Sequence, residues 1–582
     1  MRLRSHLLVV LLFIGILVLA TPGFSQQSKI SPDLQGVNPL SNVNVIVQFS
    51  QSPSLLTLEE IPLLGGTVKG TLALVNGLLC SLPVPLLEVV ASLPGVTYIS
   101  PDRLDIPLLD NSAAAVNAST AWQSGWTGQG IGVAIIDSGI SNHADLDDSR
   151  GRFRVAYSQD FTGTGGTKDQ YGHGEHVAGI VAGDAADSIC ANCTRQFRGI
   201  APAASLINLR VLDQNGAGTD SQVIAALAEA IALKNVYNIR VINLSIGRPV
   251  FESYRFDPLC RAVEAAWKAG IVGVVAAGNN GQDDYQDTGG CGTITAPGND
   301  PYVITVGAMK SMGTPQRTDD LIASYSSKGP TSIDHIVKPD LVAPGNLVVS
   351  LMANNGSATL PESNPQLDVP VSYYENTTST SLSSQYFTLG GTSMATPVVT
   401  GAVADLLQAD PALTPDQVKA RLMLTAYKQF PLSSTATDPT TGQTYTSYYD
   451  VFTVGAGYLD IAAALASSSV ASGTALSPTA TYNSSTGSVF LVSDPPSVWE
   501  TSPVWSDGSV WGNQSVWGTQ VVWGNQSVWG DQSVWGTQSV WGTQSVWGTQ
   551  SVWGTQSVWG TRSVWGTSAA DDAELTMING EQ

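Results

Sequence analysis

Five near-continuous apolar runs restrict the folds that this chain can adopt. They are IGVAIID (131–137), SLINLRVL (205–212), VINLSIG (241–247), IVGVVAAGN (271–279) and YVITVGAM (302–309). Runs without polar alternation predict strands that are buried on both faces. Helix patterns over 221–236 and 258–270 lie between them. The sequence therefore predicts an α/β fold, with a parallel sheet that helices cover on both faces through right-handed crossovers.

Three polar residues stand where such a fold places its chemistry. Asp137 closes the first apolar run, and His173 precedes a small-residue helix pattern in YGHGEHVAGIVAG. Ser393 opens another helix pattern in LGGTSMATPVVTG. A serine hydroxyl becomes a good nucleophile when an imidazole takes its proton, and a buried carboxylate holds that imidazole in place. The three residue types predict acyl-transfer chemistry at the carboxyl end of the sheet.

Each of these residues also has a structural alternative. An aspartate that ends a strand is commonly a turn residue, and a serine at a helix start is commonly a cap. Position 395 is alanine, so the segment around Ser393 departs from the G-x-S-x-G turn of the α/β-hydrolases. The joint occurrence of Asp137, His173 and Ser393 is what favours catalysis.

The chain has only five histidines, which narrows the choice of a base. His6 lies in an amino-terminal export pattern, and His176 would share a helix face with His173 and pack. His143 is expected to be structural, and His335 has no informative context. His173 remains as the candidate base.

The three segments resemble the catalytic segments of the subtilisin-like serine proteases, in the chain order Asp, His, Ser. The resemblance covers nearly all of 113–468 and implies a serine endopeptidase with Asp137, His173 and Ser393 as its triad. It also implies that Asn279, in VVAAGNNG, donates to the oxyanion of the tetrahedral intermediate. The chemistry requires no cofactor, and structural calcium, although found in many relatives, is not assignable to residues of this chain.

Substrate-binding segments follow from the same resemblance. LDQNGAG (212–218) is similar to the edge segment that pairs with an extended substrate, where Gly216 and Gly218 allow close approach. Protein or peptide substrates are therefore the expected partners.

Two further segments resemble the walls of the main specificity pocket, and they contribute Ser245, Gly247 and Gly278. Thr295 stands where relatives often carry glycine. We expect a raised pocket floor and a preference for uncharged residues.

The chain departs from the family pattern at two places. Glu175 replaces the commoner threonine two residues after His173, and its carboxylate could shift the pH optimum. The loop before 198–202 carries Cys190 and Cys193 in place of the Asn-rich, calcium-binding sequence of many relatives. A disulfide is expected to stabilise this loop instead.

The five cysteines are candidates for disulfides in an oxidising compartment. A single C-x-x-C without a second ligand pair is weak evidence for zinc. We expect bridges Cys190–Cys193 and Cys260–Cys291, with Cys80 unpaired in a segment that is later lost, although spacing alone does not fix this connectivity.

Changes in composition and residue pattern along the chain predict a secreted zymogen with several parts. A basic start, a short apolar run and a small-residue exit are typical of a secretory signal. Strand patterns over 43–49 and 67–75, and a helix–strand pattern over 85–100, resemble the α+β propeptide of subtilisin-like proteases, which would be a partner of its own enzyme. The expected order is a signal (1–25), an inhibitory propeptide (26–112), a catalytic domain (113–468), a Ser/Thr-rich linker (469–496), a Trp repeat (497–567) and a tail (568–582).

The Trp repeat consists of twelve hexads, mostly SVWGTQ, from Trp499 to Trp565. An even period keeps the valines on one face of an extended chain and the tryptophans on the other, so the repeat is β-type or unstructured. Trp side chains could stack on sugar rings or mediate contact with the cell surface. A surface-attached binding or display protein is therefore the alternative function. A net charge of −21 argues against nucleic acid as a partner.

Overall fold

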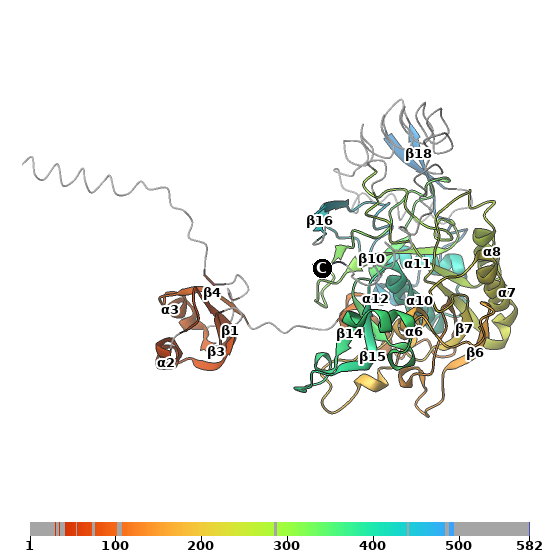
Figure 1. Cartoon of the computed structure of the whole chain (residues 1–582). Helices are drawn as coiled ribbons and strands as arrows, with labels where there is room; N and C mark the ends of the chain where they lie inside the picture. The colour runs from red at the N-terminus through yellow and green to blue at the C-terminus, as the bar shows by residue number, and fades with distance from the viewer. Residues whose placement is uncertain are drawn as a thin grey trace, which may run out of the picture. The chain divides into compact units, whose positions relative to one another are not determined.

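A computed structural model describes residues 29–493 and 581, apart from short gaps at 31–33, 35–40, 54, 73–75, 102–107, 284–287, 439–441 and 484–487. The expected signal and the Trp repeat lie outside the described residues. The chain divides into two compact units, Met1–Asp105 and Ile106–Gln582. Both are shown in Figure 1.

The first unit is a small α+β fold with its own apolar core. Its antiparallel sheet has the strand order β2-β3-β1-β4. Alternate side chains of β1 turn inward, as Val45 and Val47 do, and Cys80 is buried on the neighbouring strand. The elements are β1 (Asn42–Phe49), α2 (Leu55–Leu63), β2 (Thr67–Leu72), β3 (Gly77–Pro83), η3 (Val84–Leu86), α3 (Leu87–Ala91) and β4 (Val96–Pro101).

An eight-stranded sheet forms the centre of the second unit. Its order is β11-β10-β9-β8-β5-β7-β6, with β12 also paired to β10, and all pairs are parallel except β10 with β11. The five apolar runs correspond to β5, β7, β8, β9 and β10. The strands are β5 (Gly132–Asp137), β6 (Val155–Asp160), β7 (Ser205–Arg210), β8 (Ile239–Leu244), β9 (Val272–Ala276), β10 (Ile304–Lys310), β11 (Leu321–Ile322) and β12 (Leu341–Pro344).

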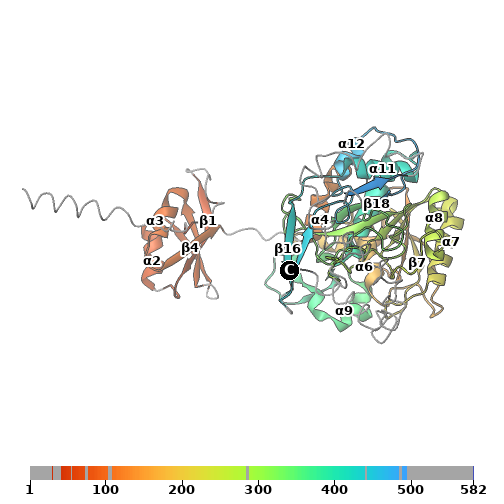
Figure 2. The same ribbon diagram turned by 90° about the horizontal axis from the view of Figure 1, so that it is seen from above.

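Helices cover both faces of this sheet, as the apolar runs predict. Along β5, Val133 and Ile135 point into one core, while Ala134 and Ile136 point into the other. The first core is closed by α6 (His173–Ala182) and α10 (Thr392–Ala409), and the second by α7 (Asp220–Tyr237) and α8 (Pro258–Lys268). Figures 1 and 2 show α7 and α8 together on one side of the sheet. The predicted α/β fold is confirmed.

The remaining helices of the second unit surround this core. They are α4 (Leu108–Ala115), α5 (Ala118–Gln123), α9 (Thr359–Ser363), α11 (Pro415–Thr425) and α12 (Ile461–Ala466), with short 3-10 turns η4 (Ala144–Leu146), η5 (Ala186–Ser188), η6 (Ala353–Gly356), η7 (Pro365–Leu367) and η8 (Val371–Tyr373). The last turn of α4 is buried at Ala113 and Ala115, so the unit begins before residue 113.

Three small antiparallel sheets complete the unit. They are β13 (Val348–Leu351) and β14 (Asp368–Pro370) on either side of β15 (Leu382–Leu389), the hairpin β16 (Ser433–Thr437) and β17 (Thr444–Tyr448), and the hairpin β18 (Thr479–Asn483) and β19 (Ser488–Val492). The last hairpin falls in the segment that we expected to be a linker. Ala475 is fully buried there, and Ala480 N donates to His335 O at 2.8 Å. The described part of 469–496 is thus packed on the catalytic unit, because its small side chains fit against it.

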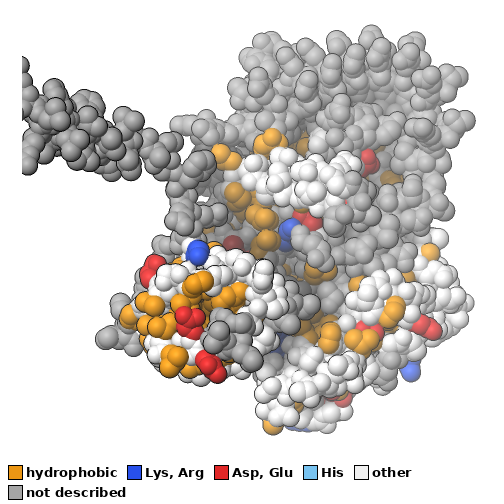
Figure 3. All heavy atoms as spheres, turned by 60° about the vertical axis from the view of Figure 1, so that its left-hand side comes forward, with side chains coloured by type: hydrophobic (Ala, Val, Ile, Leu, Met, Phe, Trp, Pro, Cys, Tyr) orange, Lys and Arg blue, Asp and Glu red, His pale blue; other side chains and the backbone are white. Residues whose placement is uncertain are grey.

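Within the described residues, no helix has both the length and the apolar composition that a bilayer crossing requires. On the described atoms of the face in Figure 3, charged side chains are few and scattered.

Candidate active site

The end of β5 and the start of α6 bring a carboxylate and an imidazole into contact. Asp137 is the last residue of β5 and His173 the first of α6, and His173 Nδ1 lies 2.7 Å from Asp137 Oδ1. Ser138 N donates to the same oxygen at 2.7 Å. Gly172, with φ of 114°, allows the sharp entry into α6. This contact fixes His173 with Nδ1 toward the carboxylate, so Nε2 is the nitrogen left for a reacting group.

Asp137 and Asp169 together raise the pKa of His173 by more than burial lowers it. Burial lowers the pKa of His173, but the charge and hydrogen bond of Asp137 raise it, as does the charge of Asp169, and the net result is a raised pKa. The imidazolium that forms when His173 takes a proton is therefore stabilised.

Asp169 organises the turn that leads into His173. Its Oδ1 accepts hydrogen bonds from Tyr171 N at 3.0 Å and Gly172 N at 2.8 Å, and its Oδ2 accepts from Glu175 N at 2.8 Å. It is buried, and burial raises its pKa. We did not single out Asp169 in the sequence. The signal that could have marked it is an aspartate before a glycine turn and a helix start.

Ser393 lies at the start of α10, the helix that packs against α6. Gly391 precedes the helix with φ of 138°, a conformation suited to glycine. Ser393 Oγ donates to Ser245 O at 3.1 Å, and Ser245 Oγ donates to Ser393 O at 2.8 Å. Within the described part of the chain, no hydrogen bond links Ser393 to His173. A catalytic hydrogen bond of this kind often forms only once substrate is bound.

Asn279 follows β9 and faces the same helix start. Its Oδ1 accepts from Thr392 N at 2.9 Å and from the Thr392 hydroxyl at 3.0 Å. A Cβ at Gly391 would lie 3.1 Å from Asn279 Nδ2. Because the oxygen is held by two donors, Nδ2 remains as a donor beside the turn that precedes Ser393.

The two glycines of the expected substrate-pairing edge have internal reasons to be glycine. A Cβ at Gly216, where φ is 71°, would lie 2.7 Å from the ring of Tyr171. A Cβ at Gly218 would lie 2.5 Å from Val211 O. At both positions the backbone lies too close to neighbouring atoms of this unit to leave room for a side chain, so glycine is explained without a bound substrate.

Thr295 packs between the two expected pocket walls. A Cβ at Gly247 would lie 2.5 Å from Thr295 Oγ1, and a Cβ at Gly278 would lie 2.7 Å from Thr295 Cγ2. The Thr295 hydroxyl donates to Ala277 O at 3.2 Å, which fixes the side chain. The space that two wall glycines leave is therefore partly filled.

Arg248, next to one wall, ties it to the rest of the unit. Its Nη2 lies 2.8 Å from Asp220 Oδ2 and 2.9 Å from Asp257 Oδ1, and its backbone pairs with Ala296. The network fixes the segment that carries Gly247. We did not single out Arg248, although it directly follows the SIG of the wall segment.

Comparison with known proteins decides the family. Residues 128–457, more than half of the chain, match the sequence profile described as the subtilase family. The chain belongs to the subtilase family. The matched span includes Asp137, His173, Asn279 and Ser393, and it makes the chain a subtilisin-like serine endopeptidase.

Individual relatives agree with this membership. The chain is 38% identical over 327 residues to Serine protease AprX of Bacillus subtilis. This match covers 54% of this chain and 66% of that protein. It is 30% identical over 432 residues to Subtilisin E of Bacillus subtilis, covering 73% of this chain and 94% of that protein. It is also 30% identical over 337 residues to Alkaline protease of Shouchella clausii, and this match covers 57% of this chain and 69% of that protein.

Glu175, the unusual carboxyl of this subtilase, is fully buried. Its Oε2 accepts from Ser141 N at 2.5 Å. Burial raises the pKa of Glu175 well above its usual range, and the charge of Asp169 adds to the effect. The carboxyl is neutral where an exposed glutamate would be ionised. The charged groups that raise the pKa of His173 are Asp137 and Asp169, and Glu175 is not among them.

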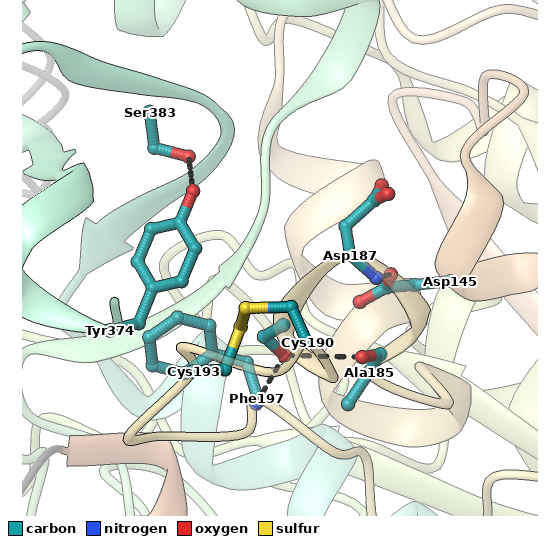
Figure 4. The surroundings of a disulfide bond; sticks show 9 residues. Asp145, Ala185, Asp187, Cys190, Cys193, Phe197, Tyr374 and Ser383 are labelled. Atoms are coloured by element: carbon teal, nitrogen blue, oxygen red, sulfur yellow. Dashed lines mark hydrogen bonds between the residues drawn. A yellow bond between two sulfur atoms is a disulfide. The ribbon is translucent and has the colours of Figure 1, made fainter. Parts of the chain in front are cut away.

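A disulfide joins Cys190 and Cys193, as expected for the loop that departs from the family pattern. Figure 4 shows it beside Phe197 and Tyr374. Thr194 N donates to Tyr374 O at 2.8 Å, and the Phe197 ring meets the Tyr374 ring edge-on with centroids 5.6 Å apart. The loop is therefore held both by the bond and by aromatic packing.

The expected bridge between Cys260 and Cys291 is wrong. Neither residue takes part in a disulfide, and both are buried. The Cys260 thiol donates to Asn299 Oδ1 at 3.2 Å from the first turn of α8, while Cys291 pairs by its backbone with Lys328. The two cysteines serve separate local contacts. Cys80 is likewise outside any disulfide, as expected.

One cluster near the disulfide has metal-binding residue types. His143, Asp145 and Asp187 place ligand atoms within 4.8 Å of one another. Asp145 Oδ1 already accepts from Asp187 N at 2.7 Å, and its Oδ2 accepts from the Tyr386 hydroxyl at 2.8 Å. Calcium prefers about six to eight oxygen ligands, so an imidazole and a carboxylate engaged at both oxygens do not fit it.

His176 and His143 have structural contacts. His176 Nε2 lies 3.0 Å from Val348 O, its ring packs edge-on against Phe387, and burial lowers its pKa to about 3. His143 Nε2 lies 3.2 Å from Gln385 O. The packing role expected for His176 is confirmed.

Proposed function

We propose that this endopeptidase cleaves peptide bonds through an acyl-enzyme on Ser393. Ser393 Oγ attacks the scissile carbonyl carbon while His173 Nε2 takes its proton. The C–N bond then breaks as His173 returns the proton to the leaving amine, and water hydrolyses the ester by the reverse sequence. Asp137 holds the imidazole through the 2.7 Å contact, which is the observation that carries the proposal.

The oxyanion that forms during attack requires donors near Ser393. Asn279 Nδ2 supplies one, because Thr392 holds the amide oxygen. The Ser393 main-chain N–H supplies the second. Loss of one such donor lowers kcat by about 10²–10³, a magnitude established on subtilisin itself. No cofactor takes part in these steps.

Specificity follows from the side chain between the pocket walls. We infer that the pocket formed by Ser245, Gly247 and Gly278 accepts small or medium uncharged side chains, because Thr295 occupies part of its depth. The substrate backbone would pair with the edge at Gly216 and Gly218.

Production as a secreted zymogen is supported by the sequence before the catalytic unit. A signal-like start over 1–25 precedes the α+β fold of the first unit, which spans Asn42–Pro101 and would act as the propeptide. Processing should fall at 101–107. Cleavage within α4 would disrupt the helix that places Ala113 and Ala115 in the core of the catalytic unit.

Cleavage of an internally quenched peptide library tests this function. The secreted protein should cut peptides internally, and the Ser393→Ala variant should show no cleavage above background. Amino-terminal sequencing of the same sample should find a start within 102–108. Peptidase activity that survives in Ser393→Ala would contradict the proposal.

The display alternative would place function in the Trp repeat, which lies outside the described residues. A variant without 497–567 separates the two hypotheses. Full peptidase activity with loss of cell or glycan association would assign surface attachment to the repeat. Unchanged association would refute that role.

A further inference from the structure

Glu581, one residue before the end of the chain, is bound by the catalytic unit. Its carboxylate Oε1 lies 2.9 Å from Lys310 Nζ, and Ser324 N donates to its Oε2 at 2.5 Å. The side chains of Lys310 and Glu581 are only 9% and 10% exposed. The contact is therefore a largely desolvated ion pair with a main-chain donor at its second oxygen.

Asn346 recognises the backbone of the same residue. Its Oδ1 accepts from Glu581 N at 2.7 Å, and its Nδ2 donates to Glu581 O at 2.6 Å. An amide side chain that satisfies both main-chain groups of one residue imitates the pairing of a neighbouring strand. Lys310, Ser324 and Asn346, which we call the Glu581 socket, thus bind both the carboxylate and the main-chain groups of Glu581.

The socket is built on rigid parts of the unit. Lys310 ends β10, a central strand, and Asn346 directly follows Gly345. Tyr325, next to Ser324, places its hydroxyl 3.3 Å from Gly345 O and 3.1 Å from Gly391 N. The residues that hold Glu581 therefore adjoin those that support the turn before Ser393.

β19, which ends at Val492, belongs to the same unit as Glu581. We propose that the Glu581 socket is a binding site for Glu581 of the same chain, which it holds in cis. Val492 and Glu581, which lie on either side of the Trp repeat in the sequence, are then both held by the catalytic unit. This proposal goes beyond the peptidase function and does not depend on it.

Charge explains why the socket takes a glutamate. Lys310 as a whole residue is 7% exposed, and a nearly buried ammonium without a counter-ion is strongly unfavourable. Glutamate supplies the charge, and its Oε2 matches the Ser324 N–H. Glutamine keeps the shape but loses the charge, so Glu581→Gln leaves the socket intact and removes only the ion pair.

Zero-length cross-linking with a carbodiimide tests the site on the full chain. The protein is treated with a serine-directed inhibitor, and equal amounts of ¹⁴N- and ¹⁵N-labelled protein are mixed before the reaction. We expect an isopeptide between Lys310 and Glu581 in peptides of a single isotope. The product should persist in the control Glu574→Gln and disappear in Glu581→Gln.

Hydrogen exchange gives a second readout that needs no reactive carboxylate. In Glu581→Gln, peptides that contain Ser324 should exchange about tenfold faster than in Glu574→Gln, because the ion pair that closes the socket is lost. Absence of the cross-link in the wild type, or equal exchange in the two variants, would overturn the proposal. Mixed-isotope cross-links would overturn binding in cis and assign the socket to a second copy.

Discussion

The side-chain oxygen of Asn279 accepts hydrogen bonds from both the N–H and the hydroxyl of Thr392, at 2.9 and 3.0 Å. Thr392 directly precedes Ser393, and its hydroxyl also accepts from Gly278 N at 3.1 Å. One residue therefore links the proposed oxyanion donor, a pocket wall and the nucleophile. The orientation of Asn279 depends on this link.

Thr392→Val should lower kcat by about tenfold with little change in KM, because Asn279 then acts on the transition state with a less fixed amide. The effect should be smaller than that of Asn279→Ala, for which about 10²–10³ is expected. Steady-state kinetics on a peptide substrate measure both. Thr392→Ser keeps the hydroxyl and should retain near wild-type kcat. Equal losses in the Val and Ser variants would show that the hydroxyl is not responsible.

The raised pKa of His173 sets the acid limit of activity. Catalysis needs neutral His173, so kcat/KM should fall as the pH drops through that pKa, above the ordinary histidine value of about 6.5. Asp137→Asn removes the charge that raises the pKa. This variant should therefore lose about 10⁴ in kcat and show its acid limb at lower pH. Glu175→Gln should leave the limb in place, and an unmoved limb in Asp137→Asn would contradict the account.

Glu175 should reduce stability at alkaline pH. Its folded-state pKa is raised, so the folded protein holds a proton that the unfolded chain releases above about pH 4.3. The free energy of unfolding then falls as the pH rises from that value toward the folded-state pKa. Glu175→Gln removes this loss and should raise the melting temperature by about 2 °C or more at alkaline pH, but not at pH 4.

Thermal melts at the two pH values check this prediction. Glu362→Gln, at an exposed position, is the matched control and should change neither melt. A Glu175→Gln gain that is the same at both pH values would point to packing and not to ionisation.

Thr295→Gly should widen substrate preference. Without the side chain between Gly247 and Gly278, the pocket can admit larger residues. We expect kcat/KM for phenylalanine relative to alanine at the cleaved position to rise about 10–100-fold, the size typical of a change in pocket volume. Thr295→Ser keeps the hydroxyl contact with Ala277 O and should shift the ratio less. An unchanged ratio in Thr295→Gly would place the specificity determinant elsewhere.

Strand positions were predictable from the sequence, and so was the place of Asp137 at a strand end. The apolar run 131–137 is buried on both faces, so its end at Asp137 marks the carboxyl edge of the sheet. His173 and Ser393 each begin a helix after a glycine turn, which is a local signal. Their approach in space is not local, since it depends on α6 and α10 packing on one face of the sheet.

Contacts between distant segments were less predictable. The segment 353–385 buries Leu367 and Tyr374 and pairs through β14 with β15. Because its composition is rich in Asn, Ser and Thr, the burial of these few apolar side chains could not be predicted from the sequence. The wrong Cys260–Cys291 pairing has a similar cause, because the burial of each thiol depends on neighbours far away in the chain.

Mass spectrometry of the protein after reaction with a fluorophosphonate tests the central claim most directly. The reagent forms a phosphonyl ester with a serine that an imidazole activates, and fluoride leaves. We predict one adduct, on Ser393, in the processed wild-type protein, with labelling abolished in Ser393→Ala and about 10⁴-fold slower or more in His173→Ala. No adduct in processed wild-type protein, or an adduct on another residue, would contradict the assignment of Ser393, His173 and Asp137.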